Sequence, residues 1–154
     1  MPPFIFRKAE KADRDAVLKV VSSALLMERA WTSTSTDFSR DLEKRCERAF
    51  DGESPACMVV QHGSRVIGAS VLDFSSEAEF HLITGPCILH EYRSRGFGSA
   101  LLQHSLERLR DEGLKQANAL VRVNSTSSRF VYPKFGGVAE PLPAPTEVVP
   151  RLAA

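Results

Sequence analysis

Apolar side chains recur along most of this chain at spacings of either two or about three and a half residues, so strands and helices can be assigned in turn. The alternation that begins at Phe4 predicts a first strand. Helical spacing then predicts a helix over about 13–28 with Asp13 as its N-cap. It also predicts a second helix that Asp37 caps and that ends at 51–55.

Three strands joined by short turns are predicted next. Residues 56–61 and 66–74 flank a hairpin turn at 62–65, and a long strand is predicted over 77–89. Gly85-Pro86 lies inside this last run. A glycine followed by a proline within a strand predicts a bulge or a local splay.

The second half of the chain continues with a helix from about Ser99 to Gly113, a strand over 117–123 and a short helix over 127–135. The tail, 138–154, holds four prolines, and only Val148-Val149 suits a short edge strand there. The order β-α-α-β-β-β-α-β-α-(β) predicts an α+β or mixed α/β sheet in a single domain over 1–154.

Composition removes several classes of function. Twenty basic residues against nineteen acidic ones leave a net charge of +1, which gives no sign of a nucleic-acid partner. No apolar run approaches the roughly 18 residues of a membrane span, and the N-terminus lacks the apolar segment of a signal peptide. The three cysteines and four histidines show no metal-ligand spacing, so we expect reduced thiols, no metal and a cytoplasmic location.

The segment Arg-Ser-Arg-Gly-Phe-Gly at 93–98 carries the most specific chemistry. It lies between an apolar run and a helix start, where unpaired N–H groups and the helix dipole favour an anion. Its glycines let a ligand approach the backbone, and its arginines add positive charge. The segment therefore predicts a site for a pyrophosphate-bearing cofactor. The Rossmann and P-loop patterns are absent, and the alternative is a pair of turn glycines between two ordinary elements.

The stretch 88–102, which contains R-x-x-G-x-G, resembles the acetyl-CoA motif of the GNAT superfamily of acyl-CoA N-acyltransferases. The resemblance covers about 4–137 and is specific over 80–137. It implies a mostly antiparallel sheet, splayed between the fourth and fifth strands, with flanking helices and acetyl-CoA held at the splay. The cofactor contacts that it implies are Pro86, Cys87, Ile88, Arg93, Ser94, Arg95, Gly96, Phe97, Gly98 and Ser99.

The same resemblance implies direct transfer of an acetyl group to a primary amine, which needs a base, an oxyanion donor and an acid. Tyr132 matches the family's acid in Y-x-K-x-G-F and is also a cofactor contact, and the backbone N–H of Ile88 is the implied oxyanion donor. The base candidates are His81 and Glu79, which an unbroken strand over 77–89 would place on one face together with Glu77. His81 lies nearer the predicted splay.

Two departures from the family pattern concern the substrate side. The family's asparagine position is Ser125 here, so Asn124, one residue early, stays a candidate cofactor contact. Pro133 and Gly137 alter the tyrosine motif and the tail is short. A second subunit could therefore complete the site, as in a homodimer. The alternative role for Tyr132 is to pack its ring on the core.

Two rival functions follow. One is a catalytically silent acyl-CoA-binding sensor of the same fold, and the other is a nucleotide- or phosphate-binding protein outside this family. The acceptor is expected to be a small-molecule amine or a peptide N-terminus, because the polar segment from Trp31 to Arg40 would wall its site.

Overall fold

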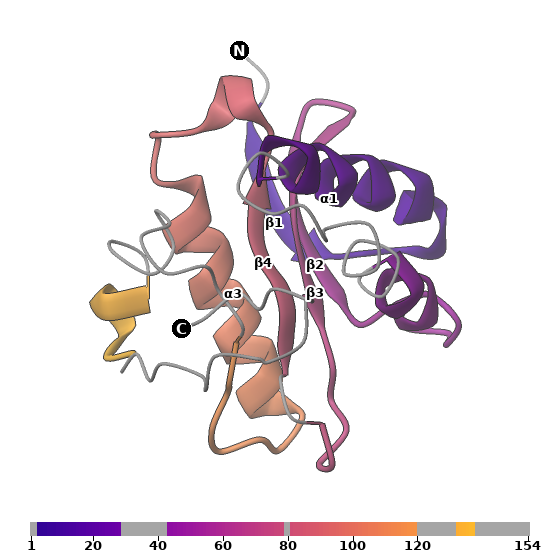
Figure 1. Ribbon diagram of the computed structural model, residues 1–154, viewed down its shortest axis with the longest axis vertical. Helices are drawn as coiled ribbons and strands as arrows, with labels where there is room; N and C mark the ends of the chain where they lie inside the picture. The colour runs from indigo at the N-terminus through magenta and orange to yellow at the C-terminus, as the bar shows by residue number, and fades with distance from the viewer. Residues whose placement is uncertain (1–2, 29–42, 79–80, 120–131, 138–154) are drawn as a thin grey trace, which may run out of the picture.

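A computed structural model describes residues 3–28, 43–78, 81–119 and 132–137 of the 154-residue chain (Figure 1). Its centre is an antiparallel sheet of four strands in the order β1-β2-β3-β4. The strands are β1 (Phe4–Lys8), β2 (Cys57–His62), β3 (Arg65–Leu72) and β4 (Leu82–Ile88). The strands predicted from the N-terminus to the hairpin are therefore confirmed within one or two residues at each end.

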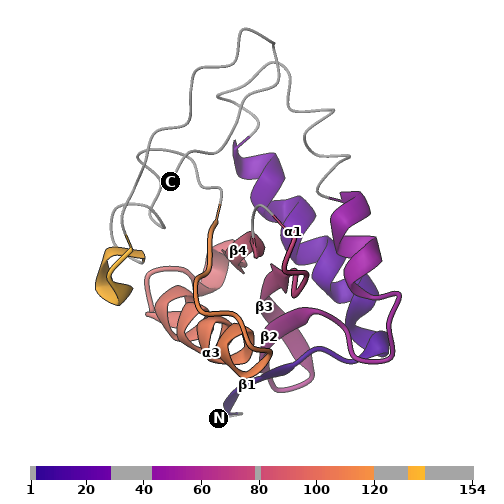
Figure 2. The same cartoon turned by 90° about the horizontal axis from the view of Figure 1, so that it is seen from below.

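Helices cover both faces of this sheet (Figure 2). One face carries α1 (Arg14–Glu28) and the helical residues 43–49, and the other carries α3 (Phe97–Asp111). Apolar side chains from both helix layers and the sheet form one buried core, which confirms the α+β class. No helix in the described ranges is long and apolar enough to cross a bilayer.

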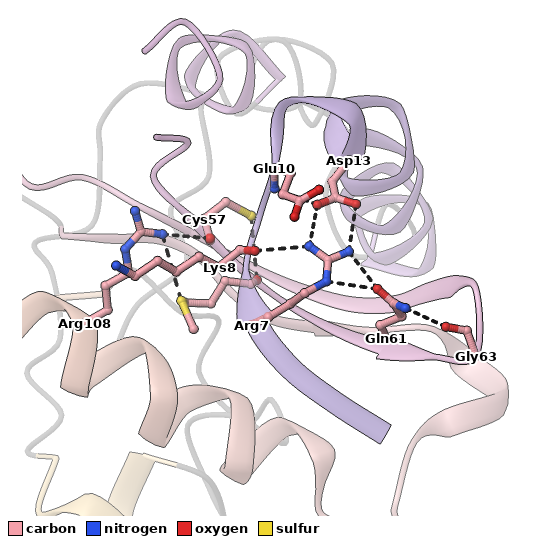
Figure 3. Close-up of polar contacts among 9 residues, drawn as sticks. Arg7, Lys8, Glu10, Asp13, Cys57, Gln61, Gly63 and Arg108 are labelled. Atoms are coloured by element: carbon pink, nitrogen blue, oxygen red, sulfur yellow. Dashed lines mark hydrogen bonds and ion pairs between the residues drawn. The ribbon is translucent and has the colours of Figure 1, made fainter. Parts of the chain in front are cut away.

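The start of α1 differs from the prediction. Residues Lys11–Asp13 form a short 3-10 turn whose N-cap is Glu10, and α1 follows at once from Arg14, so Asp13 lies inside this helical run rather than before it. The Asp13 carboxylate instead accepts a hydrogen bond from the Glu10 N–H at 2.7 Å and two from Arg7 at 2.7 and 3.0 Å (Figure 3). Arg7 also donates to Gln61 Oε1, and its hydrogen bonds lower the pKa of Asp13. This network ties the entry of α1 to β1 and β2.

The interruption predicted at Gly85-Pro86 is present as a bulge. Ala69 pairs with Cys87 and Val71 pairs with Thr84, so Gly85 and Pro86 together lie opposite a single residue of β3. A second irregularity follows, because the next pair joins Leu72 to Leu82. β4 is therefore bent by two extra residues within seven.

The strand predicted over 77–89 begins only at Leu82. Before it, the backbone turns: the Ala78 N–H donates to the Ser75 carbonyl at 3.1 Å. Polar side chains hold this turn, since Asp73 Oδ1 accepts from the Ser75 N–H at 2.8 Å and Ser75 Oγ accepts from the Glu77 N–H at 3.2 Å. Glu77 therefore lies in a turn, and the prediction that it shares a strand face with His81 is wrong.

The elements after α3 are described only in part. Of the strand predicted over 117–123, Ala119 forms a parallel bridge with Leu82, and the Asn118 carbonyl accepts from the His81 and Leu82 N–H groups, both at 3.0 Å. Of the helix predicted over 127–135, the 3-10 turn η5 (Tyr132–Phe135) is present. The predictions for Asp37, for 120–131 and for the tail with Val148-Val149 lie outside the described residues.

An arginine on the inner face of α3 fastens this helix to the sheet. Arg108 is 4% exposed and donates to the Cys57 carbonyl at 2.9 Å and to Ser54 Oγ at 3.3 Å, and its guanidinium lies 4.8 Å from the ring centre of Phe74. Figure 3 shows its side chain reaching from α3 to the start of β2. Burial lowers its pKa. Among the described residues no carboxylate forms an ion pair with it, so carbonyl and ring contacts hold this cation.

Candidate functional site

The loop between β4 and α3 ends in a helix start that no side chain caps. Gly96 is the N-cap residue of α3, with φ of 84°, and makes no side-chain capping bond. The helix therefore begins two residues before the predicted Ser99. Ser94 also has a left-handed backbone, with φ of 64°. A Cβ placed on Gly96 would meet no atom within 4 Å. The first-turn N–H groups of a helix have no partner within the helix itself and point beyond its N-terminus.

The loop's arginines contact the loop itself. Arg93 is exposed and donates from Nε to the Ile88 carbonyl at 3.1 Å. The guanidinium carbon of Arg95 lies 5.5 Å from the ring centre of Tyr92. Arg65, from the hairpin, lies 6.0 Å from the same ring and pairs with Glu91 at 2.9 Å. Positive charge therefore gathers beside the uncapped helix start.

An aromatic cluster, formed by Phe4, His62, Tyr92 and Phe97, holds this loop against the sheet. The Phe4 ring stacks on His62 with centres 4.3 Å apart and contacts Phe97 at 4.4 Å. His62 Nδ1 and the Tyr92 hydroxyl are 2.8 Å apart. Sequence reasoning missed this cluster because its members come from three distant segments. The only local signal was the pair of aromatic residues in the first strand.

The outer edge of β4 presents backbone groups at its last residues. The Leu89 N–H donates to Ile67 at 2.8 Å, so Leu89 faces β3 and the N–H and carbonyl of Ile88 face the other way. The bond from Arg93 to the Ile88 carbonyl agrees with this orientation. Pro86 has no N–H and can only accept a hydrogen bond at this edge.

Tyr132 lies in η5, beside the first turn of α3. Lys134 Nζ donates to Ser99 Oγ at 3.3 Å, which joins the two elements (Figure 1). The pKa of Tyr132 is raised, first by burial and then by the nearby Cys87 thiol. The Gly137 N–H donates to the Tyr132 carbonyl at 3.1 Å, and a Cβ on Gly137 would lie 2.9 Å from that oxygen. The tight turn therefore explains why a glycine replaces the family's aromatic residue.

His81 lies at the opposite end of β4. It is 7% exposed, and its Nδ1 is 3.2 Å from the Asp73 carbonyl oxygen. Because a carbonyl only accepts, this bond requires a proton on Nδ1 and leaves the Nε2 lone pair available in the neutral ring. At about 3.3 Å per residue, roughly 20 Å of strand separates His81 from Ile88. The structure does not bring His81 to the loop, and Glu79 and Asn124 lie outside the described residues.

No group of three or more metal-binding side chains occurs among the residues that the structure describes. The two cysteines of the core, Cys46 and Cys57, are completely buried, and Cys87 on β4 is half-buried. Burial raises the pKa of Cys46 to about 12 and also raises the pKa of Cys57. These two thiols are therefore protonated structural residues at neutral pH.

Comparison with solved structures shows the same fold in several acetyltransferases. The N-acetyltransferase PaiA of Thermoplasma acidophilum, solved in complex with coenzyme A, is 15% identical, with a TM-score of 0.67 over 92% of this chain and 94% of that one. An acetyltransferase of the GNAT family from Streptococcus pneumoniae is 17% identical, with a TM-score of 0.61 over 90% and 86%. Ard1 of Thermoplasma volcanium is 19% identical, with a TM-score of 0.60 over 89% and 84%.

None of the curated protein sequences is a significant match to this chain. The model of the acetyltransferase (GNAT) family, by contrast, matches residues 24–137, which is most of the sequence and includes the β4–α3 loop and η5. Acetyl-CoA is the cofactor of this family. With a matching sequence and a matching fold, this chain belongs to the GNAT acetyltransferase family.

Proposed function

We propose that this chain is an N-acetyltransferase of one domain that transfers an acetyl group from acetyl-CoA to the primary amine of a small molecule or a peptide N-terminus. One observation carries the proposal. A helix start with a left-handed glycine and no side-chain cap follows a bulged strand, after a loop that includes the 3-10 turn His90–Tyr92, and the backbone groups of the strand's last residue point away from the sheet. This arrangement offers donors to a pyrophosphate and a strand edge to an amide-bearing arm.

The residues present fit the cofactor. The backbone of Arg93 to Ser99 would hold the pyrophosphate, since the N-cap residue Gly96 has no side chain to bond the first-turn N–H groups of α3. The backbone of Pro86, Cys87 and Ile88 would hold the pantetheine arm. Because Pro86 only accepts, we expect a donor from the arm at that position, and the Ile88 N–H would be left for the carbonyl oxygen of the thioester. Asn124 remains a proposed contact.

A residue of this chain is proposed for each proton transfer in the reaction. Acetyl-CoA supplies the activated acyl group. His81 Nε2, or Glu79 as the alternative base, would take the proton from the acceptor ammonium through intervening water, because roughly 20 Å of strand separates His81 from Ile88. The Ile88 N–H donates to the developing oxyanion. The Tyr132 hydroxyl would give its proton to the leaving sulfur; burial raises its pKa, so the phenol holds that proton at neutral pH.

Calorimetry tests the cofactor half of the proposal. We expect coenzyme A and acetyl-CoA to bind at micromolar concentrations, and ATP to compete poorly because it lacks the pantetheine arm. No binding at high micromolar concentration, or equal binding of ATP and coenzyme A, would contradict the assignment. A panel of amines and peptides, with release of free thiol as the readout, tests turnover and identifies the acceptor.

A second candidate function is an acyl-CoA sensor without turnover. The burial of His81 and its bond to the Asp73 carbonyl, far from Ile88 along β4, favour this candidate. It predicts that acetyl-CoA binds normally and that no amine in the panel accelerates thiol release. Release of thiol that depends on one class of amine excludes it.

A further inference from the structure

We propose that His62, a residue of the β2–β3 hairpin, is a positioning residue for the cofactor loop and acts through Tyr92 without touching coenzyme A. The inference rests on the proposed function, because it assigns a task to a residue behind the same site. It concerns the preorganisation of the loop 93–98 rather than any new contact with the cofactor.

The link between His62 and the loop is short and direct. His62 is the last residue of β2, and its Nδ1 lies 2.8 Å from the hydroxyl of Tyr92. Tyr92 ends the 3-10 turn His90–Tyr92, immediately before Arg93. The His62 ring also stacks on Phe4, with centres 4.3 Å apart and planes 11° apart. The imidazole is therefore fixed on the sheet by one contact and fixes Tyr92 by another.

Tyr92 in turn contacts both sides of the loop. The Arg95 guanidinium lies over its ring at 5.5 Å, and the Phe97 ring centre, at the first residue of α3, lies 6.4 Å away. Phe97 also contacts Phe4 at 4.4 Å. A continuous set of contacts thus runs from His62 to two residues of the predicted pyrophosphate site, Arg95 and Phe97. A loop held in one conformation before binding loses less conformational freedom when the ligand arrives.

The polar atoms of His62 indicate that its bond to Tyr92 is the reason for an imidazole here. Its Nε2 is buried and has no hydrogen-bond partner within the described part of the chain. A phenyl ring would stack on Phe4 equally well. It would also avoid the unfavourable burial of a nitrogen without a hydrogen-bond partner. What the imidazole adds is the bond from Nδ1 to the Tyr92 hydroxyl. Its loss would leave that hydroxyl without this partner and release the loop.

The chain offers a matched control for this role. His104, on α3, stacks on Phe6 with ring centres 4.9 Å apart and planes 16° apart, much as His62 stacks on Phe4. Its polar contact is with Glu107 at 3.9 Å rather than with the loop. His104→Ala therefore removes a comparable aromatic stack and leaves the bond to Tyr92 in place.

The test compares His62→Ala, His62→Asn, Tyr92→Phe and His104→Ala in the full-length protein. The dissociation constant of coenzyme A is measured by calorimetry, with thermal unfolding as the fold readout, and KM and kcat are measured once an acceptor is known. We expect His62→Ala and Tyr92→Phe to weaken binding about tenfold and to raise the KM for acetyl-CoA with little change in kcat, since one buried bond is lost in each. In His62→Asn the side-chain amide takes the position of Nδ1, so binding should stay within about threefold of wild type.

The outcomes separate positioning from mere packing. If His62→Ala and His104→Ala lower the melting temperature alike and neither changes coenzyme A affinity, the positioning role is wrong. If His62→Ala does not fold, Tyr92→Phe decides, because it removes one oxygen and keeps the ring. Unchanged affinity in that variant overturns the inference. Failure of the wild-type protein to bind coenzyme A is a different result, because it overturns the proposed function and with it this role.

Discussion

The end of β4 leads into an exposed loop with unpaired backbone donors, whereas its beginning follows a buried histidine whose ring is bonded to a carbonyl. At the loop end, side chains from the hairpin and from β1 hold the backbone in shape and leave its N–H groups open. At the other end, the backbone groups of His81 and Leu82 are already bonded to Asn118. We propose the first end as the cofactor site, whereas the backbone bonds at the second end fasten it to the neighbouring segment.

The strongest way to break this comparison is to strain the loop end. Gly96→Val places a β-branched residue at a φ of 84°, a conformation that such residues avoid, and should weaken coenzyme A binding by more than about a hundredfold because the helix start must rearrange. Gly113→Val is the matched control, since Gly113 has a φ of 94° at the other end of α3 and a Cβ placed there would also meet no atom within 4 Å. Calorimetry and thermal unfolding should show similar destabilisation in both variants but lost binding only in the first. Equal loss of binding in both would mean that the strain acts through the whole helix.

Removal of the Tyr132 hydroxyl should give the next largest effect. Tyr132→Phe is expected to lower kcat about a hundredfold, the usual contribution of one general acid, with coenzyme A affinity nearly unchanged. Because the pKa of Tyr132 is raised above its ordinary 10.0, the protonated acid is present below that value, and wild-type kcat should not fall through loss of this proton up to about pH 10. The checks are steady-state kinetics and a pH profile. An unaltered rate in Tyr132→Phe would remove this residue from the chemistry.

His81 tests the other end of the strand. His81→Gln keeps a side chain of similar length that can still donate to the Asp73 carbonyl but cannot accept a proton from an ammonium. If His81 is the base, we expect kcat/KM to fall about tenfold or more and the acid limb of its pH profile to disappear. A fall in melting temperature with an unchanged profile would assign His81 to structure alone and leave Glu79 as the candidate base.

The smallest effects are expected in the reactivity of the three cysteine thiols toward an alkylating reagent. Burial raises the pKa of Cys46 to about 12 and raises that of Cys57, so neither should react with iodoacetamide in the folded protein at pH 8. Cys87, half-buried on β4, should react slowly, and bound coenzyme A should slow it further if this strand holds the pantetheine arm. Mass spectrometry of the native protein should then show at most one modification, against three in urea. Fast labelling of Cys46 or Cys57 would contradict the buried core.

Local patterns predicted the elements whose causes are local. The β2–β3 hairpin follows from its turn residues, and the bulge follows from Gly85-Pro86. The start of β4 was misplaced because Asp73 and Ser75 hold a turn through side-chain bonds to the backbone, which apolar alternation does not register. The segment 93–98 was recognised because a helix start after a strand has a short sequence signature.

The parts that the sequence did not reveal depend on contacts between distant segments. His62 and Tyr92 are thirty residues apart, and no local sequence pattern near either residue predicts their hydrogen bond. Asp13 was expected to cap a helix, but Arg7 on the neighbouring strand binds its carboxylate. The burial of Arg108 was not predicted. Its spacing of seven from the buried Leu101 could have placed it on the inner face of α3.

The attachment of Arg108 bears on whether the cofactor helix could be transplanted. α3 is 15 residues long, about 22 Å, and its first turn, which we propose as the phosphate site, and Arg108 lie towards opposite ends of the helix. If only the loop and the first turns of α3 were grafted onto another sheet, the helix would lose the contacts by which Arg108 fastens it. A successful graft therefore also needs the groups that Arg108 contacts: Ser54, the Cys57 carbonyl and the Phe74 ring.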